Sequence, residues 1–271
     1  MITRSWFLVG LALLCLCVGG CVQLERFNPD FPATHEEILI DRQRMRDNPV
    51  GLERPVLVLS GYRSPSLVAG RLKRSILRHT GADTGEIATL AYVWSGSVEE
   101  PARRAVARVE DMFPSDDPRW TSEVDVVAVS MGGLVARLAA SDPELRGEQG
   151  GKQLRIGTLY TLASPHRGAK LAEDIHLDSA TRAMIPGSEF LEVLDETFQS
   201  REYEVVPYAV LNDSWVGATN AAPVGQEPIW TPGRSFLSHH MVSFDIRIQT
   251  DLLRRLRGEE PIGLPGAPPC D

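Results

Sequence analysis

Apolar runs alternate with helical patterns from about residue 55 to residue 257, and this alternation predicts the fold. Runs of apolar residues predict buried strands within 55–62, 86–94, 123–130, 154–164 and 203–213, and a weaker strand within 229–238. Amphipathic segments predict helices within 66–81, 98–113, 131–143 and 245–258. Strands that alternate with helices form a parallel sheet covered on both faces. We therefore expect an α/β fold with a predominantly parallel sheet of about six strands.

The segments on either side of this region are polar and rich in chain breakers. Residues 22–54 contain "NPDFP" and "DNPVGLERP", which predict a tether with one short helix near 35–46. The tail 258–271 is rich in proline and glycine and predicts a flexible coil. No internal repeat is visible, so we expect one domain over residues 55–257.

The first 21 residues, "MITRSWFLVGLALLCLCVGGC", have the pattern of an export signal. Arg4 precedes an apolar stretch that is shorter than the roughly 20 residues of a membrane-spanning helix, and small residues follow it. We predict a signal peptide over 1–20. The ending "VGGC" resembles the bacterial lipobox, which implies that Cys21 is lipidated and anchors an exported lipoprotein in the cell envelope. The alternative is a soluble exported protein cleaved near the same place.

Charge and composition exclude several other classes. The net charge is −8 and no Lys/Arg-rich block occurs, so nucleic acid is not an expected partner. Cys15 and Cys17 would leave with the signal and Cys21 would carry lipid, so only Cys270 remains and no internal disulfide is expected. The histidines are scattered and no phosphate-binding glycine loop is present, so we expect neither a metal nor a cofactor.

The segment "VAVSMGGLVAR", residues 127–137, contains the main candidate for chemistry. In parallel α/β sheets, functional groups lie at the carboxyl ends of strands, and Ser130 lies between a predicted strand and a predicted helix. The pentapeptide "AVSMG" is close to the G-x-S-x-G nucleophile elbow, with Ala128 at the first small position. The alternative is that Ser130 only caps the following helix.

Residues further along the chain supply partners for a nucleophilic serine. A catalytic triad on this kind of fold runs in the chain order Ser, acid, His. Asp213 follows the last long predicted strand, and His239 and His240 precede the last predicted helix. A carboxylate there would orient the imidazole that takes the serine proton. Taken singly, Asp213 has the alternative of a turn residue and the histidines that of a surface or core pair.

Five stretches together resemble the α/β hydrolases of the lipase and esterase kind, in particular bacterial and GPI-inositol-deacylase-like lipases. They are "AVSMGGLVAR", "TLASPHRGAK", "MIPGSEFLEVLDE", "NDSWV" and "SHHMVSFDIRI". In the acid loop of that family an apolar residue follows the acid by three, as Val216 follows Asp213. In the histidine loop an apolar residue lies three after the base and an aspartate six after. Val242 and Asp245 meet these conditions for His239, which favours His239 over His240 as the base.

The resemblance also implies an oxyanion hole and a set of supporting residues. Its two donors would be the backbone N–H groups of Met131 and Tyr62. Ser60 departs from the family pattern, in which a histidine is common at that position. We interpret His166, within "SPHRG", as structural support rather than as a base.

Two further features lie near the site in the sequence. Trp215, Trp230 and Phe236 lie close to the predicted acid and histidine loops and either line an acyl pocket or belong to the core. The stretch 170–202 is a candidate cap over the site.

The sequence therefore predicts a serine hydrolase that cleaves carboxylic esters, of lipids or other acyl groups, at a membrane surface. Ser130 would be the nucleophile, His239 the base and Asp213 the acid. A thioesterase, amidase or acyltransferase on the same scaffold is the first alternative, because a fold does not fix the reaction. A non-catalytic envelope lipoprotein with a hydrolase fold is the second.

Overall fold

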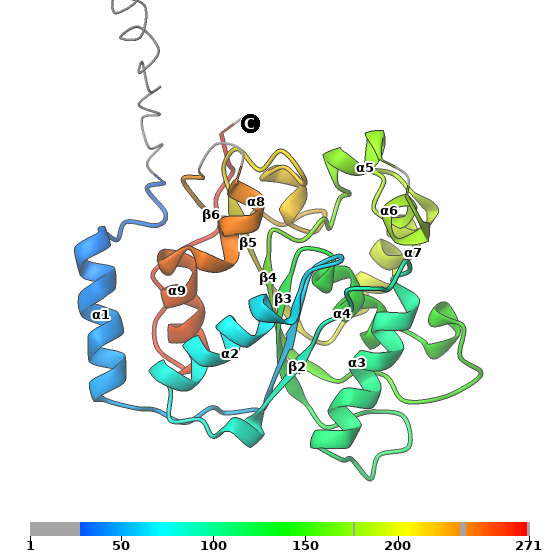
Figure 1. Ribbon diagram of the computed structural model, residues 1–271, viewed down its shortest axis with the longest axis horizontal. Helices are drawn as coiled ribbons and strands as arrows, with labels where there is room; N and C mark the ends of the chain where they lie inside the picture. The colour runs from blue at the N-terminus through cyan, green and yellow to red at the C-terminus, as the bar shows by residue number, and fades with distance from the viewer. Residues whose placement is uncertain (1–27, 176, 234–236, 270–271) are drawn as a thin grey trace, which may run out of the picture.

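One parallel sheet organises the chain. The computed structural model describes residues 28–175, 177–233 and 237–269. Within them the strands lie in the order β2-β1-β3-β4-β5-β6, and every neighbouring pair is parallel (Figure 1). The strands are β1 (Val56–Leu59), β2 (Ile87–Leu90), β3 (Val124–Val129), β4 (Ile156–Leu162), β5 (Glu204–Val210) and β6 (Ile229–Thr231). The predicted α/β fold with a six-stranded parallel sheet is confirmed.

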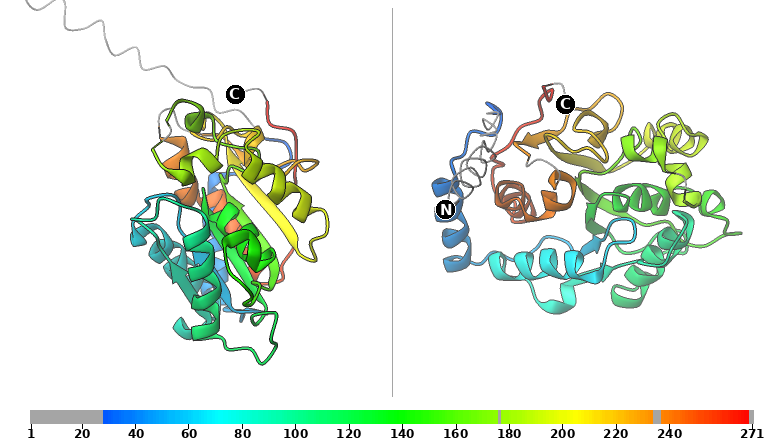
Figure 2. Two further views of the ribbon diagram at one scale, coloured as in Figure 1. Left: turned by 90° about the vertical axis from the view of Figure 1, so that its right-hand side faces the viewer. Right: turned by 45° about the horizontal axis from the view of Figure 1, so that its top comes forward.

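Two helical layers cover the two faces of the sheet (Figure 2). One layer contains α3 (Glu99–Met112), α4 (Gly132–Ala140) and α7 (Glu189–Phe198); the other contains α1 (His35–Asp47), α2 (Ser66–His79) and α9 (Ile246–Leu256). Successive residues of a strand point to opposite faces. Leu57 and Leu59 of β1 therefore join the first layer, while Val56 and Val58 join the second. Because both faces are covered, β1 and β3 are buried along their whole length, which explains why every residue in them except Asp125 is apolar.

The register of the strands brings their carboxyl ends to one edge. Leu59 of β1 pairs with Ala128 of β3, and Val129 pairs with Leu162 of β4. On the other side of β4, Leu162 pairs with Tyr208 of β5. The loops that follow these strands therefore meet above the same edge of the sheet, and the candidate residues are carried by those loops.

Short helices cover this carboxyl edge and connect the longer elements. Near the edge lie α5 (Lys170–Asp174), α6 (Ser179–Ala183), the start of α7, and α8 (Ser238–Met241) (Figure 1). The 3₁₀ helices are η1 (Thr84–Glu86), η2 (Pro143–Arg146), η3 (Thr219–Ala221) and η4 (Val242–Phe244). We call residues 170–198, with α5, α6 and α7, the cap segment.

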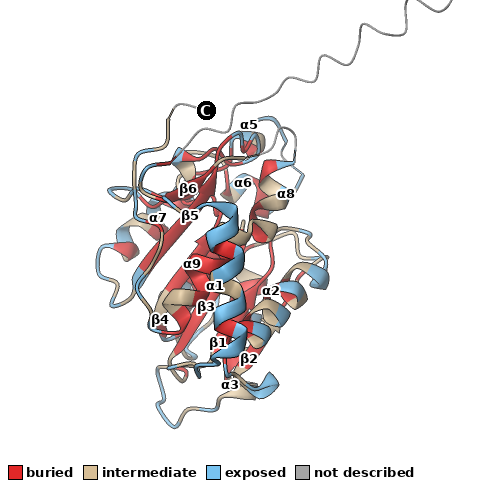
Figure 3. Cartoon of the chain, turned by 90° about the vertical axis from the view of Figure 1, so that its left-hand side faces the viewer, coloured by how far each residue is buried: buried red, intermediate tan, exposed pale blue. Residues whose placement is uncertain are grey.

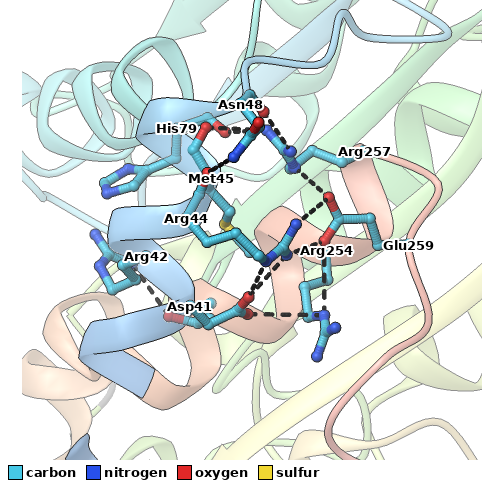
Figure 4. A network of polar contacts seen from close by, with 10 residues as sticks. Asp41, Arg42, Arg44, Met45, Asn48, His79, Arg254, Arg257 and Glu259 are labelled. Carbon is cyan, nitrogen blue, oxygen red and sulfur yellow. Dashed lines mark hydrogen bonds and ion pairs between the residues drawn. The ribbon is translucent and has the colours of Figure 1, made fainter. Parts of the chain in front are cut away.

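The N-terminal helix is part of the folded body. α1 begins at His35 as predicted, but it packs against α2 and α9 (Figure 3). A polar network joins α1 to the end of α9 (Figure 4). In it, Arg257 donates to the carbonyl oxygens of His79 and Asn48, both at 2.7 Å, and Glu259 accepts from Arg44 and Arg257. From α1 onward this segment is therefore held to the domain and does not behave as a free tether.

The C-terminal segment shows a similar difference from expectation. Residues 258–269 contain no helix or strand, as their composition predicted. They are nevertheless held in place, because the buried Asp251 accepts hydrogen bonds from the amides of Ile262 at 2.6 Å and Gly263 at 2.8 Å. A buried carboxylate needs such donors, and an irregular backbone provides them. No pattern of apolar residues in the sequence predicts this contact.

The predicted export signal and Cys21 lie outside the described residues. Among the helices that the structure describes, none combines the length and the apolar character needed to cross a bilayer.

Candidate active site

Ser130 stands in a sharp turn between β3 and α4. Its φ is +53°, in the left-handed region that residues with a Cβ atom rarely adopt. The turn is tight because the helix starts against neighbouring backbone. A Cβ atom at position 132 would lie 2.8 Å from the Ser60 carbonyl oxygen, so only glycine fits there. This is the strand–turn–helix geometry that a nucleophile elbow requires.

His239 connects Ser130 to Asp213. Its Nε2 lies 3.0 Å from Ser130 Oγ, and its Nδ1 lies 2.9 Å from Asp213 Oδ2. With Nδ1–H donating to the carboxylate, Nε2 is free to accept the serine proton. The structure therefore brings together three side chains that are far apart in the sequence, in the hydrogen-bonded order of a Ser–His–Asp triad.

The acid loop holds Asp213 by its second oxygen. Asp213 Oδ1 accepts from the amides of Trp215 at 2.9 Å and Val216 at 3.0 Å. The carboxylate is almost fully buried, and these donors replace the water that it has lost. Val216 is buried as well, which explains the apolar residue three positions after the acid.

The residues that follow His239 fix the histidine loop to the domain. Val242, three residues after His239, is buried in the core. Asp245, six residues after, accepts from the Thr231 hydroxyl at 2.8 Å and caps α9 by accepting from the Arg247 amide at 2.9 Å. The spacing of this motif thus ties the base both to the end of β6 and to the start of the last helix.

The two adjacent histidines contact the indole of Trp215 in different ways. It stacks on the His239 ring, with centroids 5.2 Å apart and planes 13° apart. The His240 ring meets the same indole edge-on at 4.5 Å. The hydrogen bonds to Ser130 and Asp213 are made by His239, in line with the spacing argument that favoured it.

The two predicted oxyanion donors lie on either side of the nucleophile. Met131 is the N-cap residue of α4, where amides are not used by the helix. On the other side, a Cβ atom at Gly61 would lie 3.0 Å from Ser130 Cβ, so the loop that carries Tyr62 passes directly beside Ser130. Among the described residues, neither amide donates a hydrogen bond to another part of the chain.

Ser60, at the position where the family often has histidine, belongs to the buried support of this loop. Its amide donates to the Leu90 carbonyl oxygen at 3.1 Å, and its own carbonyl oxygen accepts from the Tyr92 hydroxyl. Burial raises the pKa of Tyr92, so the hydroxyl stays protonated and remains a donor. The start of the oxyanion loop is therefore anchored to β2 and to the loop after it.

His166 takes no part in the hydrogen bonds around Ser130. It is fully buried, with Nδ1 3.3 Å from the Arg137 guanidinium and Nε2 3.1 Å from Thr161 Oγ1. Burial, reinforced by the positive charge of Arg137, lowers the pKa of His166 well below its ordinary value. A permanently neutral ring that joins α4 to β4 agrees with its interpretation as structural support.

The motifs "SPHRG" and "PGSEFL" contact one another. A Cβ atom at Gly168 would lie 2.5 Å from Pro186, and the Ala169 amide donates to the Met184 carbonyl oxygen at 2.7 Å. Ser188 then caps α7 by accepting from the Leu191 amide. The two motifs thus set the path of the cap segment over the carboxyl edge of the sheet.

The aromatic residues near the site divide between the two interpretations. Trp230 is buried in the core. Trp215 is 38 % exposed and covers one face of the His239 ring. Phe236 lies outside the described residues.

Two functional contacts were missed at the level of sequence. One is the stacking of Trp215 on His239. The other is a hydrogen bond of 2.6 Å from the Tyr62 hydroxyl to Asp178 of the cap segment. The sequence "DSAT" at 178–181 signals a helix cap, which the structure contains, but not the contact with Tyr62.

As for metals, the described residues contain no group of three or more His, Cys, Asp or Glu side chains arranged to hold an ion.

Comparison with known proteins agrees with this architecture. The sequence model of the PGAP1-like alpha/beta domain family matches residues 96–185, which include Ser130 and much of the cap segment. No curated protein matches the chain.

Among solved structures, the lipase BlEst2 of Bacillus licheniformis in its propeptide form is similar with a TM-score of 0.53 and 13% identity, over 82% of this chain and 54% of that one. Phospholipase PlaB of Legionella pneumophila in complex with thio-NAD gives a TM-score of 0.48 and 15% identity, over 62% of this chain and 44% of that one. Lipase B of Aspergillus fumigatus gives a TM-score of 0.41 and 11% identity, over 69% of this chain and 44% of that one. The chain thus spans about half the length of these proteins, and at such identities the likeness concerns the fold alone.

The parallel sheet, the strand–turn–helix at Ser130 and the likeness to BlEst2 define the class of fold: the chain has an α/β-hydrolase fold. More particularly, residues 96–185, about a third of the chain, are similar to the PGAP1-like alpha/beta domain family. Both agree with the resemblance drawn from the sequence motifs.

Proposed function

We propose that the chain is a serine hydrolase that cleaves carboxylic esters by way of an acyl-enzyme on Ser130. The observation that carries the proposal is the continuous chain from Ser130 Oγ through His239 to Asp213, with distances of 3.0 and 2.9 Å. A serine that only capped a helix would direct its hydroxyl to a backbone amide, whereas Ser130 Oγ faces the imidazole.

The geometry suggests the order of proton transfers. Ser130 Oγ attacks the ester carbonyl carbon while His239 Nε2 takes the hydroxyl proton, and Asp213 stabilises the resulting imidazolium. The amides of Met131 and Tyr62 would donate to the oxygen that becomes negative. When the tetrahedral intermediate collapses, the alcohol leaves with the proton from His239. Water then attacks the acyl-enzyme with its proton passing to His239, and the acid product leaves as Ser130 regains its proton.

The surroundings of the site favour an apolar acyl group. The segments between the strands, at the carboxyl edge, carry large apolar side chains that are exposed: Leu67 at the start of α2, and Trp94, Leu177, Trp215 and Leu237 outside the regular elements. An apolar chain of a lipid or another acyl ester would bury surface against such residues, at about 25 cal/mol per Å² of apolar area removed from water.

A chromogenic ester series tests the proposal. The folded protein should hydrolyse p-nitrophenyl esters, and Ser130→Ala should lower kcat by at least about 10⁴-fold without changing the melting temperature. Thioester and amide analogues of the best ester, and added acceptor alcohols, separate an esterase from a thioesterase, amidase or acyltransferase. Turnover of every ester at the same rate by wild type and Ser130→Ala would refute the proposal.

We further propose that the exported protein is anchored in the bacterial cell envelope by lipid on Cys21. The support is the lipobox-like "VGGC" after a basic and apolar leader. Metabolic labelling with an alkyne fatty acid should mark the wild-type chain and not Cys21→Ser. An unlabelled wild-type chain recovered in the soluble exported fraction would favour simple secretion.

A further inference from the structure

The loop that carries Tyr62 is held by a carboxylate from the cap segment. The Tyr62 hydroxyl donates to Asp178 Oδ2 at 2.6 Å, and the Arg63 guanidinium donates to the same oxygen at 3.1 Å. The phenol and guanidinium of these two residues also lie together, with the Arg63 carbon 5.1 Å from the Tyr62 ring centroid. One oxygen of one side chain therefore fixes two consecutive residues of the predicted oxyanion loop.

Asp178 is itself immobilised from the opposite side. Its other oxygen, Oδ1, caps α6 by accepting from the Thr181 amide at 3.0 Å. The two residues that follow it are tied to the loop after β2, because the Ser179 hydroxyl and the Ala180 amide both donate to the Gly96 carbonyl oxygen at 2.8 Å. The carboxylate thus serves as a fixed point, with one oxygen used for the helix cap and the other for the loop.

The oxyanion loop needs such a fixed point. Residues 61–64 form a turn closed by the Ser64 amide and the Gly61 carbonyl oxygen at 3.1 Å. Within it, Arg63 has a φ of +49°, a left-handed conformation that a residue with a Cβ atom adopts only when its surroundings enforce it. The contacts to Asp178 are contacts of this kind, and they act on the residue next to the predicted donor.

The hydrogen bond is charge-assisted at neutral pH. Burial alone would raise the pKa of Asp178, but hydrogen bonds from Tyr62 and Thr181 and the charge of Arg63 outweigh it, and the pKa is lowered. Burial and the hydrogen bond to the carboxylate raise the pKa of Tyr62 to about 12. The phenol therefore keeps its proton and the carboxylate its charge, which is the stronger type of hydrogen bond.

We infer that Asp178 is a positioning residue of the active site: by holding the Tyr62 hydroxyl, it holds the Tyr62 amide at the distance from Ser130 at which it stabilises the oxyanion. The inference rests on the proposed function. Asp178 acts through Tyr62 and contacts no reacting atom. It makes the cap segment a part of the catalytic geometry, in addition to any effect on substrate access.

Asp178→Asn separates this role from the role of a helix cap. Asparagine is as good an N-cap as aspartate, so its oxygen can still accept from Thr181. Its amide nitrogen would then face Tyr62 and Arg63 in place of a carboxylate oxygen. We expect kcat to fall about tenfold and KM to change by less than about twofold, because an oxyanion donor acts in the transition state and not in the ground state.

Tyr62→Phe removes the other half of the contact and leaves the backbone amide in place. It should reproduce the effect of Asp178→Asn, and the double variant should be no worse than either single one, because both changes break the same interaction. Asp142→Asn is the matched control. Asp142 caps η2 through the Glu144 amide and touches no part of the oxyanion loop, so kcat should be unchanged.

A readout at the oxyanion itself distinguishes positioning from general loosening. A trifluoromethyl ketone with the acyl chain of the substrate places a charged oxygen in the oxyanion hole when Ser130 adds to it. Its inhibition constant should rise about tenfold in Asp178→Asn, in step with the loss of kcat. Active-site titration corrects each kcat for protein that is not folded.

Hydrogen exchange at the amides of residues 61–64 tests the contact independently of turnover. Exchange there should be faster in Asp178→Asn and unchanged in Asp142→Asn. Unaltered exchange in Asp178→Asn, or faster exchange with kcat per active site equal to wild type, would overturn the inference. Absence of Ser130-dependent turnover in the wild type would instead refute the proposed function, and the exchange rates would still show whether Asp178 holds the loop.

Discussion

The two sides of the candidate site are held in different ways. On the acid–base side, Asp213 and His239 lie close to the ends of β5 and β6, and short-range contacts fix them: two amides within three residues of Asp213, and an aspartate six residues after His239. On the oxyanion side, the loop after β1 is fixed mainly by side chains that are remote in sequence. Tyr92 supports the carbonyl oxygen of Ser60, and Asp178 holds the side chain of Tyr62.

The two sides of the site therefore depend on different parts of the fold. The acid–base side is built into the ends of the strands, so its geometry follows from the sheet. The oxyanion side also depends on Asp178, which lies in the cap segment between α5 and α6 and not at the end of a strand. In this account, changes in the cap affect the rate through the position of the Tyr62 amide as well as through the shape of the entrance.

The largest effect is expected from Asp213→Asn on the acid–base side. The asparagine oxygen would keep the two backbone amides, while its nitrogen would face His239 Nδ1 and favour the wrong tautomer of the ring. By analogy with serine proteases, kcat should fall by about 10⁴-fold with little change in stability. Ester hydrolysis and thermal unfolding measure the two effects. Asp174→Asn, at an exposed aspartate of α5, is the control, and a loss below tenfold in Asp213→Asn would contradict the assigned role.

A smaller but clear effect is expected from Gly61→Ala on the oxyanion side. The added methyl group would lie 3.0 Å from Ser130 Cβ and 3.4 Å from the Val129 carbonyl oxygen, so the loop must move away from the nucleophile. A misplacement of about 1 Å in a catalytic site costs about 10²-fold, and the few tenths of an ångström required here should lower kcat by roughly tenfold. Gly85→Ala is the matched control, since its Cβ atom meets nothing within 4 Å. Equal rates in the two variants would show that the loop does not contribute.

Trp215→Ala should have a still smaller effect. The indole stacks on His239 and limits the orientations of the imidazole, and an aromatic pair of this type contributes about 0.5–1.5 kcal/mol. We expect kcat to fall by about threefold to tenfold, as follows from that energy. His240→Ala should leave kcat within about twofold, because the hydrogen bonds to Ser130 and Asp213 come from His239. A larger loss in His240→Ala than in Trp215→Ala would reverse the assignment of the two histidines.

The smallest effect on activity is expected far from both sides, at His79. This buried residue donates from Nδ1 to the Ser75 carbonyl oxygen at 2.7 Å, and its Nε2 has no partner among the described residues. Burial lowers the pKa of His79 to about 4, further assisted by three arginines nearby. The unfolded chain takes up this proton near pH 6.5 and the folded chain only near pH 4, so stability is full above pH 6.5 and is lost as the pH falls through that range.

Thermal unfolding between pH 7 and 4.5 measures this contribution. For His79 the loss is at most about 1.4 kcal/mol per pH unit. His79→Gln should show a smaller fall in melting temperature over this range, with ester hydrolysis at pH 7.5 equal to wild type. A pH dependence of unfolding that is the same in both proteins would show that His79 is protonated as readily in the folded as in the unfolded state.

The sequence predicts most of the acid–base side, for a physical reason. A buried parallel strand is mostly apolar, so five strands appear as apolar runs and the sixth as a weaker one, and the end of a run marks the edge where polar groups gather. Ser130 and Asp213 each follow such a run directly, and His239 precedes the last amphipathic helix. Local pattern and chain order therefore predict Ser130 and Asp213 and narrow the base to His239 or His240, whereas the choice of His239 comes from the resemblance to the lipase family.

The remaining features depend on contacts that leave no local pattern. Asp178 reaches Tyr62 across 116 positions of the chain, and its sequence context signals only a helix cap. The packing of α1 and of the C-terminal segment depends in the same way on Arg257 and Asp251, which are polar residues on an otherwise ordinary amphipathic helix or just after it. Buried polar pairs of this kind become evident only when both partners are placed in space.

Labelling of the mature protein with a fluorophosphonate probe, followed by peptide mass spectrometry, shows directly whether Ser130 is an activated nucleophile. The probe reacts with a serine only when a neighbouring base activates it. We expect one modified peptide, carrying the adduct on Ser130, and no adduct in the folded Ser130→Ala protein. A folded wild-type protein that remains unlabelled would contradict it, and would favour a lipoprotein that uses the hydrolase fold for binding.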